Sequence, residues 1–143
     1  MRNFISEDDI EQAILQKLEG DPFQYGILRC DPSPDKRELL PDGTGRSSKK
    51  ECVLPLILRE ALARLNPDIP GEKLEEIARD LCRDFSATDM TATNYKYYNQ
   101  IRNGIKISLR RNGKEDFDFV KLVDFDRPED NTFTDVSQMW IQG

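Results

Sequence analysis

Apolar residues near the start of the chain recur at helical spacing. Ile10, Ile14 and Leu18 are each four positions apart, which predicts a helix with one apolar stripe. The preceding stretch SEDD, residues 6–9, has the pattern of a capping box at a helix start, and Gly20 is placed to end the helix. The first helix is therefore bounded on both sides by local signals.

Glu11 departs from the sorting of polar and apolar residues along this helix. It precedes Leu15 by four positions and Leu18 by seven, so it lies on the flank of the apolar stripe. A carboxylate in that place is expected either at a solvated rim or partly buried beside a partner. The sequence leaves both alternatives open.

Three further helices are predicted, and proline and glycine mark their ends. The stretch SKKE, residues 48–51, has the pattern of a second capping box, but Pro55 must kink that helix or delay its start. A last helix is expected from about residue 91 to residue 103, with Gly104 as its C-terminal cap. Its tyrosine cluster is expected to pack rather than to stack on bases. The helix between these two has apolar positions at Leu74, Ile77, Ala78, Leu81 and Phe85.

After Gly104 the hydrophobic period changes from 3.6 to 2, which predicts strands. Apolar and polar residues alternate over 105–110, and Asn112-Gly113 is a hairpin turn signal. We expect a three-residue or bulged turn, because it would set Leu109 opposite Phe117 and would likewise keep the other apolar residues of the two strands on one face.

The second strand of the hairpin is predicted within FDFVKLVDF, residues 117–125. Val120 and Leu122 make it apolar on both faces, which favours a central strand covered on both sides. A closing strand is predicted over 132–141. Helices followed by a β-hairpin and a third strand indicate an α/β (α+β) fold, and the small sheet predicts a single N-terminal domain, residues 1–143, that continues past Gly143.

Residues 21–47 are rich in proline and glycine and predict a loop-rich extension with one short element around residues 23–30. The stretch GTGRSSKK within and beside it lacks the spacing of a phosphate loop. It is expected to be a basic surface loop, with a cationic cluster formed by Arg46, Lys49 and Lys50.

The composition limits the chemistry that this chain can perform. The chain has 143 residues, a formal net charge of −6, no histidine and three widely spaced cysteines. These features argue against a structural zinc site and against a Ser/His or Cys/His catalytic pair. No signal peptide or long apolar run is present, so a cytoplasmic protein with reduced cysteines is expected.

Several motifs occur in an order that resembles a known family. They are CVLPLILREALARLNPDIP, then YNQIRNGIKIS, then FVKLVDFDRPEDNTF and SQMWIQG, between Glu51 and Gly143. In this order the chain resembles the N-terminal segment of the R subunit of type I restriction-modification enzymes. The resemblance implies the first half of a restriction-endonuclease-like core. It also implies a parent protein that cuts duplex DNA with Mg²⁺ and ATP beside methyltransferase and specificity subunits.

The family's catalytic Asp and Glu-x-Lys follow the SQMWIQG-like strand, and no residues of this chain occupy that place. The chain is therefore expected to stop before the nuclease motif and to be inactive alone. One catalytic candidate remains, because nucleases of this kind often place an acidic residue on the first helix close to the metal. Glu11 has the corresponding position.

A basic stretch around the predicted hairpin is the candidate DNA contact. From Asn94 to Lys114 there is no acidic residue, and such a stretch suits the phosphate backbone. The alternative is a solvated edge strand. Two other functions remain open, namely a non-catalytic DNA-binding or docking module and a nuclease segment of another helicase-linked protein. The proposed DNA-binding residues are Arg102, Lys106, Arg110, Arg111 and Lys114.

Overall fold

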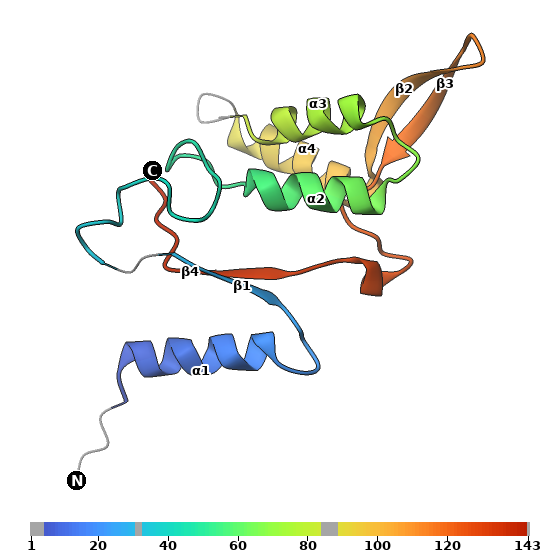
Figure 1. Ribbon diagram of the computed structural model, residues 1–143. Helices are drawn as coiled ribbons and strands as arrows, with labels where there is room; N and C mark the ends of the chain where they lie inside the picture. Colours follow the sequence, from blue (N-terminus) through green and yellow to red (C-terminus); the bar gives the residue numbers. More distant parts are fainter. Residues whose placement is uncertain (1–4, 31–32, 84–88, 143) are drawn as a thin grey trace.

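The computed structural model describes residues 5–30, 33–83 and 89–142. It is a mixed α/β structure, as predicted, in which helices accompany two small two-stranded sheets (Figure 1). The helices are α1 (Glu7–Glu19), α2 (Pro55–Leu65), α3 (Gly71–Leu81), α4 (Met90–Asn103) and the short 3-10 helix η1 (Pro128–Asp130). The strands are β1 (Gly26–Arg29), β2 (Ile105–Arg111), β3 (Lys114–Val120) and β4 (Thr134–Ser137).

Local signals set most of the helix ends. The predicted capping box of α1 is present, because the Ser6 hydroxyl accepts from the Asp9 amide and the Asp9 carboxylate accepts from the Ser6 amide. The predicted capping box of α2 is wrong, since this helix begins at Pro55, where the missing N–H costs nothing. Glu51 instead accepts a hydrogen bond of 2.9 Å from the Ser47 amide.

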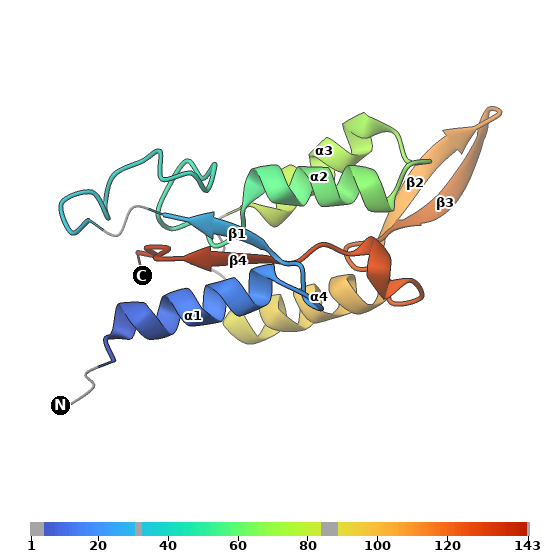
Figure 2. The ribbon, with the colours of Figure 1, turned by 60° about the horizontal axis from the view of Figure 1, so that its bottom comes forward.

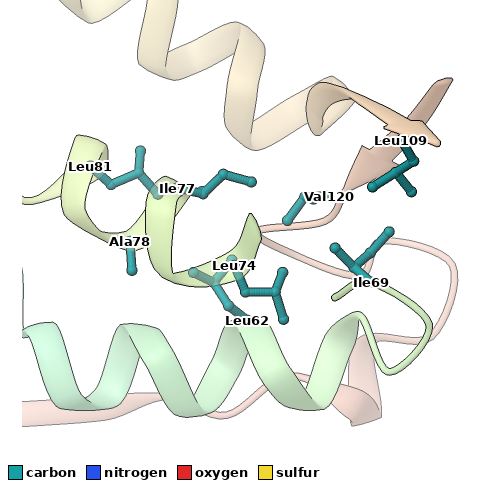
Figure 3. Packing of buried hydrophobic residues seen from close by; sticks show 8 residues of the cluster. All are labelled: Leu62, Ile69, Leu74, Ile77, Ala78, Leu81, Leu109 and Val120. Carbon is teal, nitrogen blue, oxygen red and sulfur yellow. The ribbon is translucent and has the colours of Figure 1, made fainter. Parts of the chain in front are cut away.

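The main core lies between α2, α3 and the base of the hairpin. Tyr97 of α4 packs against this core, whereas Tyr95 and Tyr98 are 70% and 57% exposed, so the expected packing holds for one tyrosine of the cluster. Phe85, predicted on the third helix, lies outside the described residues. The buried side chains, drawn in Figure 3, are Leu62, Ile69, Leu74, Ile77, Ala78, Leu81, Leu109 and Val120.

The C-terminal strand pairs with the N-terminal one. β4 lies parallel to β1, with Gly26 opposite Thr134 and Arg29 opposite Ser137. The prediction of one sheet containing the hairpin and a closing strand is therefore wrong, and β4 is shorter than expected. In Figures 1 and 2 this pair runs between α1 on one side and α2 on the other. β1 confirms the short element expected within residues 21–47.

The hairpin has a two-residue turn, so the expected bulged or three-residue turn is wrong. Asn112 and Gly113 both have positive φ, 53° and 78°, which matches the twist of a tight hairpin without a bulge. Leu109 therefore faces Asp116, and Ile107 faces Asp118. β3 also ends at Val120 and has one neighbour, so it is not the predicted central strand.

The apolar stripe expected on α1 is only partly buried. Leu15 is 2% exposed, while Ile10 and Ile14 are each 53% exposed. The helix turns Glu11 and Leu15, which are four residues apart, toward the strands. Within the described residues, no helix has the length and apolar character needed to cross a membrane.

Candidate functional site

Glu11 lies at the carboxyl ends of the two parallel strands. Its carboxylate accepts hydrogen bonds of 2.5 Å from the Ser137 hydroxyl and 2.7 Å from the Gln138 side-chain amide. Ser137 is the last residue of β4, and Gln138 follows with a positive φ of 58°. Of the two alternatives left open by the sequence, the partly buried carboxylate with partners is the one observed.

These hydrogen bonds keep Glu11 ionised. The bond from Ser137, and then the bond from Gln138, lower the pKa of the Glu11 carboxyl below its ordinary value, against a smaller effect of burial. Hydrogen bonds donated to a carboxylate favour its charged form. We call the contact of Glu11 with Ser137 and Gln138 the Glu11 junction. It presents a negative charge at the carboxyl ends of the strands, where ligands of parallel α/β sheets usually bind.

The junction does not form a metal centre by itself. Among residues 5–30, 33–83 and 89–142, no three His, Cys, Asp or Glu side chains come together in a way that could hold a metal ion. A magnesium site needs several oxygen ligands in octahedral arrangement, and Glu11 supplies one carboxylate that already has two protein donors. The residues present do not fit a complete Mg²⁺ site.

A buried ionic cluster lies in the loop before α2. Asp42 accepts hydrogen bonds of 3.0 Å from Arg46 and 2.8 Å from Lys49, and it also accepts from the Thr44 hydroxyl. The side chains of Arg46 and Lys49 are 0% and 9% exposed. The expectation of a basic surface loop is therefore wrong for these two residues. Lys50 is exposed as expected.

This cluster fixes the chain that follows β4. The Arg46 guanidinium donates to the Trp140 carbonyl at 3.0 Å, and the Gln142 amide donates to the Lys49 carbonyl at 3.0 Å. The loop and the last residues thus hold each other beside the Glu11 junction. Sequence reasoning missed this cluster. The nearest signal was an acidic residue, Asp42, four positions before Arg46.

A cavity of about 250 Å³ opens between this cluster and the junction. Its lining includes Cys30, Asp42, Lys49 and Gln138. Burial, and then the Asp42 carboxylate, raise the pKa of the Cys30 thiol above its ordinary value. The thiol is therefore protonated at neutral pH and is a poor nucleophile.

The hairpin presents a second candidate surface, distant from the junction. Lys106 and Arg110 are both exposed and alternate with the buried Leu109, so they point from the same face of β2. On that face Lys106 lies opposite Phe119, and its ammonium is 4.3 Å from the centroid of the Phe117 ring. The structure therefore brings together two of the predicted DNA-binding cations and adds two aromatic rings that the prediction did not include.

The other three predicted cations are placed differently. Arg102 is exposed on the last turn of α4 and donates to the Tyr98 hydroxyl at 3.3 Å. Lys114 is exposed beside the turn, where it pairs with Arg111 in the ladder. The register puts Lys114 out of phase with Lys106 and Arg110, and the side chain of Arg111 lies outside the described part of the chain.

A larger cavity, about 620 Å³, lies between α3, α4 and β2. Its lining includes Lys73, Arg83 and Lys106. Acidic partners compensate part of this charge, since Lys73 pairs with Glu76 at 2.8 Å and Arg83 pairs with Asp80 at 3.2 Å. The exposed hairpin face is therefore the better candidate for an anionic ligand.

Comparison with known proteins agrees with the order of motifs in the sequence. A family model described as "Type I restriction enzyme R protein N terminus" matches residues 4–143. The type I restriction enzyme HindI endonuclease subunit of Haemophilus influenzae is 28% identical over 138 residues, which cover 96% of this chain and 12% of that protein. The putative type I restriction enzyme MjaIXP endonuclease subunit of Methanocaldococcus jannaschii is 25% identical over 136 residues, 93% of this chain and 12% of that protein. No solved structure matches the chain.

Proposed function

Because the chain belongs to the family of type I restriction enzyme R protein N termini, we propose that it forms the front part of the nuclease domain of a subunit that cuts foreign duplex DNA. Of the two relatives named above, one is named as a type I restriction enzyme endonuclease subunit and the other as a putative one, and the chain spans 12% of the length of each. In this proposal the chain builds one half of a restriction-endonuclease-like core.

The contact of Glu11 with Ser137 and Gln138 is the observation that carries the proposal. α1 brings an ionised carboxylate to the carboxyl ends of a parallel strand pair. The carboxyl ends of the strands are where α/β sheets bind their ligands. We assign Glu11 the role of an acidic residue close to the metal of the complete nuclease.

The remaining catalytic groups, an Asp and a Glu-x-Lys, would come from residues outside these 143. Those acids would hold Mg²⁺, which would supply Lewis-acid chemistry at the scissile phosphate. The contribution of this chain is the position of α1 against β4, and the Asp42 cluster fixes the segment after β4 through the hydrogen bond from Arg46 to the Trp140 carbonyl. ATP would be used by motor domains elsewhere in the protein.

The partners in this proposal follow from the same assignment. Lys106 and Arg110 would contact the phosphate backbone of the DNA, since their cationic groups are exposed on one face. Methyltransferase and specificity subunits would be the protein partners, and the place of action would be the cytoplasm, where foreign DNA arrives.

The test uses the complete subunit assembled with its companion subunits. Glu11→Gln should lower DNA cleavage by about 10- to 100-fold, as expected for a carboxylate that supports a metal centre, while ATP hydrolysis is retained. Glu19→Gln, exposed at the last turn of the same helix, is the control and should change neither activity.

Two results would contradict the proposal at different levels. Unchanged cleavage by Glu11→Gln would remove Glu11 from the catalytic site. A gene without codons for an Asp and a Glu-x-Lys after the codon for Gly143 would overturn the nuclease assignment. The lack of a complete metal site in the described residues would then favour a non-catalytic DNA-binding module.

A further inference from the structure

The exposed face of the β2–β3 hairpin combines aromatic rings with cations. Phe117 and Phe119 are 56% and 54% exposed. The ladder pairs Phe119 with Lys106, and Arg110 lies two ladder positions beyond Ser108, which pairs with Phe117. The tip of the hairpin extends away from the helices (Figure 1), and Lys106 and Arg110 are exposed like the two rings.

We propose that this hairpin face binds a single DNA strand with unpaired bases. The bases stack on Phe117 and Phe119, and the neighbouring phosphates contact Lys106 and Arg110. The inference rests on the proposed function and deepens it, because it names the form of DNA that the surface recognises. Exposed aromatic rings beside cations are the usual elements of single-strand binding surfaces.

The spacing of the two rings favours an unstacked strand. Residues i and i+2 of a β-strand are separated by about 6.8 Å, which is twice the rise of about 3.4 Å between stacked nucleotides of one strand in duplex DNA. Two successive bases of an extended strand can therefore each reach one ring. In a duplex the base faces are buried in the stack, and a phenyl ring gains nothing from the phosphates.

The mixture of side chains on this face argues against a cover of apolar protein. Packing such a cover over Phe117 and Phe119 would also bury Lys106, whose ladder partner is the apolar Phe119, and burying a cation without an anionic partner is costly. A nucleic acid strand offers an apolar surface and negative charge together. The acids of β3 next to the rings, Asp116 and Asp118, alternate to the opposite face of the hairpin.

Two contacts already present on the face are compatible with this binding. The Lys106 ammonium rests over the Phe117 ring, but an exposed cation–π contact is weaker than base–aromatic stacking. A base can replace the ammonium, which then contacts the adjacent phosphate. The acidic residue of this face, Glu115, accepts a hydrogen bond of 2.9 Å from Ser108.

The test is photocrosslinking of the complete subunit to defined oligonucleotides. The probes are a single strand carrying 5-iodouracil, the same strand in a duplex, and a strand with the same phosphates but abasic sites as a competitor. Cleavage after Lys114 and Lys121 by trypsin releases EDFDFVK, residues 115–121. We expect the single strand to crosslink to this peptide, the duplex not to do so, and the abasic strand to compete poorly.

Matched variants assign the crosslink to the rings. Phe117→Leu with Phe119→Leu retains apolar side chains but removes the aromatic faces, and it should reduce the crosslink about tenfold. Phe125→Leu is the control, because Phe125 is 63% exposed but lies outside the hairpin. It should leave the yield unchanged.

The outcomes separate this inference from the proposed function. Cleavage of duplex DNA by the same protein without a crosslink to residues 115–121 overturns this inference alone. Equal crosslinking of the duplex, or equal competition by the abasic strand, also overturns it. The absence of both cleavage and crosslinking overturns both proposals. A base-dependent crosslink in a protein that cleaves supports both.

Discussion

The carboxylate of Glu11 accepts a hydrogen bond of 2.5 Å from the hydroxyl of Ser137, which lies 126 positions further along the chain. This contact joins the first helix to the last strand and places an ionised carboxylate at the end of a parallel strand pair. Since both partners are polar and partly buried, the contact is specific to this arrangement of α1 and β4.

Ser137→Ala should lower the free energy of unfolding of the chain by about 1 kcal/mol, the usual net value of such a hydrogen bond. It should also raise the pKa of Glu11 toward its ordinary value, because Ser137 is the main cause of the lowered pKa. Urea denaturation and an NMR titration of the Glu11 carboxyl measure the two effects. Ser108→Ala, which breaks an exposed serine–glutamate pair within the hairpin, should cost less. An unchanged Glu11 pKa would contradict the prediction.

Asp42→Asn should destabilise the chain by about 3–5 kcal/mol, because it leaves two buried cations without their anion. The side chains of Arg46 and Lys49 are 0% and 9% exposed, so water cannot replace the carboxylate. Chemical denaturation measures the loss. Asp126→Asn, at an exposed position, is the control and should change the stability little. A loss below about 1 kcal/mol would show that the cluster tolerates the unpaired charge.

The same carboxylate should make the stability pH-dependent. Burial raises the pKa of Asp42, but hydrogen bonds from Lys49, Thr44 and Arg46 outweigh it and hold the pKa well below its ordinary value of 3.8. The unfolded chain therefore binds this proton at a higher pH than the folded chain. The contribution to stability is complete above the unfolded pKa and is lost as the pH falls toward the folded pKa. Between about pH 4 and pH 2 the wild type should lose more stability than Asp42→Asn.

Gly104→Ala should destabilise the connection between α4 and β2 by about 1–3 kcal/mol, the cost of placing a residue with a Cβ in a positive-φ, extended-ψ conformation that essentially only glycine adopts. Gly104 has a φ of 77°, and an added Cβ would lie 2.9 Å from the Val120 carbonyl oxygen. Thermal denaturation measures the effect. Gly71→Ala is a matched control, since no atom would lie within 4 Å of its Cβ. Equal melting temperatures for the two variants would contradict the prediction.

Lys106→Gln and Arg110→Gln should each weaken the binding of single-stranded DNA and reduce the slope of log K against log salt by about 0.7, the value for one phosphate contact of a single strand. Binding of the complete subunit measured at several salt concentrations gives the slope. Lys17→Gln removes an exposed cation of α1 and should leave the slope unchanged. A slope that does not change in either hairpin variant would place the DNA elsewhere.

Motifs that carry the family resemblance have structural roles that the sequence did not reveal. Asn66, in the LNP motif, donates 2.9 Å hydrogen bonds to the Leu62 and Lys121 carbonyls and accepts from the Lys121 amide at 2.7 Å. Asp124, in the DFDRP motif, accepts from the amides of the turn that follows it, and Asn131 closes that turn. The hydrogen bonds of these residues connect the end of α2 with the residue that follows β3, and they close the turn that precedes β4. The order of the motifs along the chain is therefore the order in which these segments follow one another in the fold.

The sequence by itself determined what depends on neighbouring residues. The capping box at Ser6, the helix end at Gly20, the α4–β2 connection at Gly104 and the change of hydrophobic period were all predicted, because each signal acts over one or two helical turns or one strand. Asn112-Gly113 also predicted the hairpin itself. The expected register is wrong, because Asn112 and Gly113 both adopt positive φ and form a tight turn, which sets the register even though it does not match the apolar faces of the two strands.

Only the tertiary structure decided which distant segments meet. The pairing of β1 with β4, the contact of Glu11 with Ser137 and the burial of Arg46 each join residues that are far apart or that appear solvated in the sequence. Parallel pairing needs a long crossover, and here the crossover contains α2, α3, α4 and the hairpin. The free energy of such contacts comes from burial and from satisfied polar groups, and both depend on the packed structure rather than on any local pattern of residues.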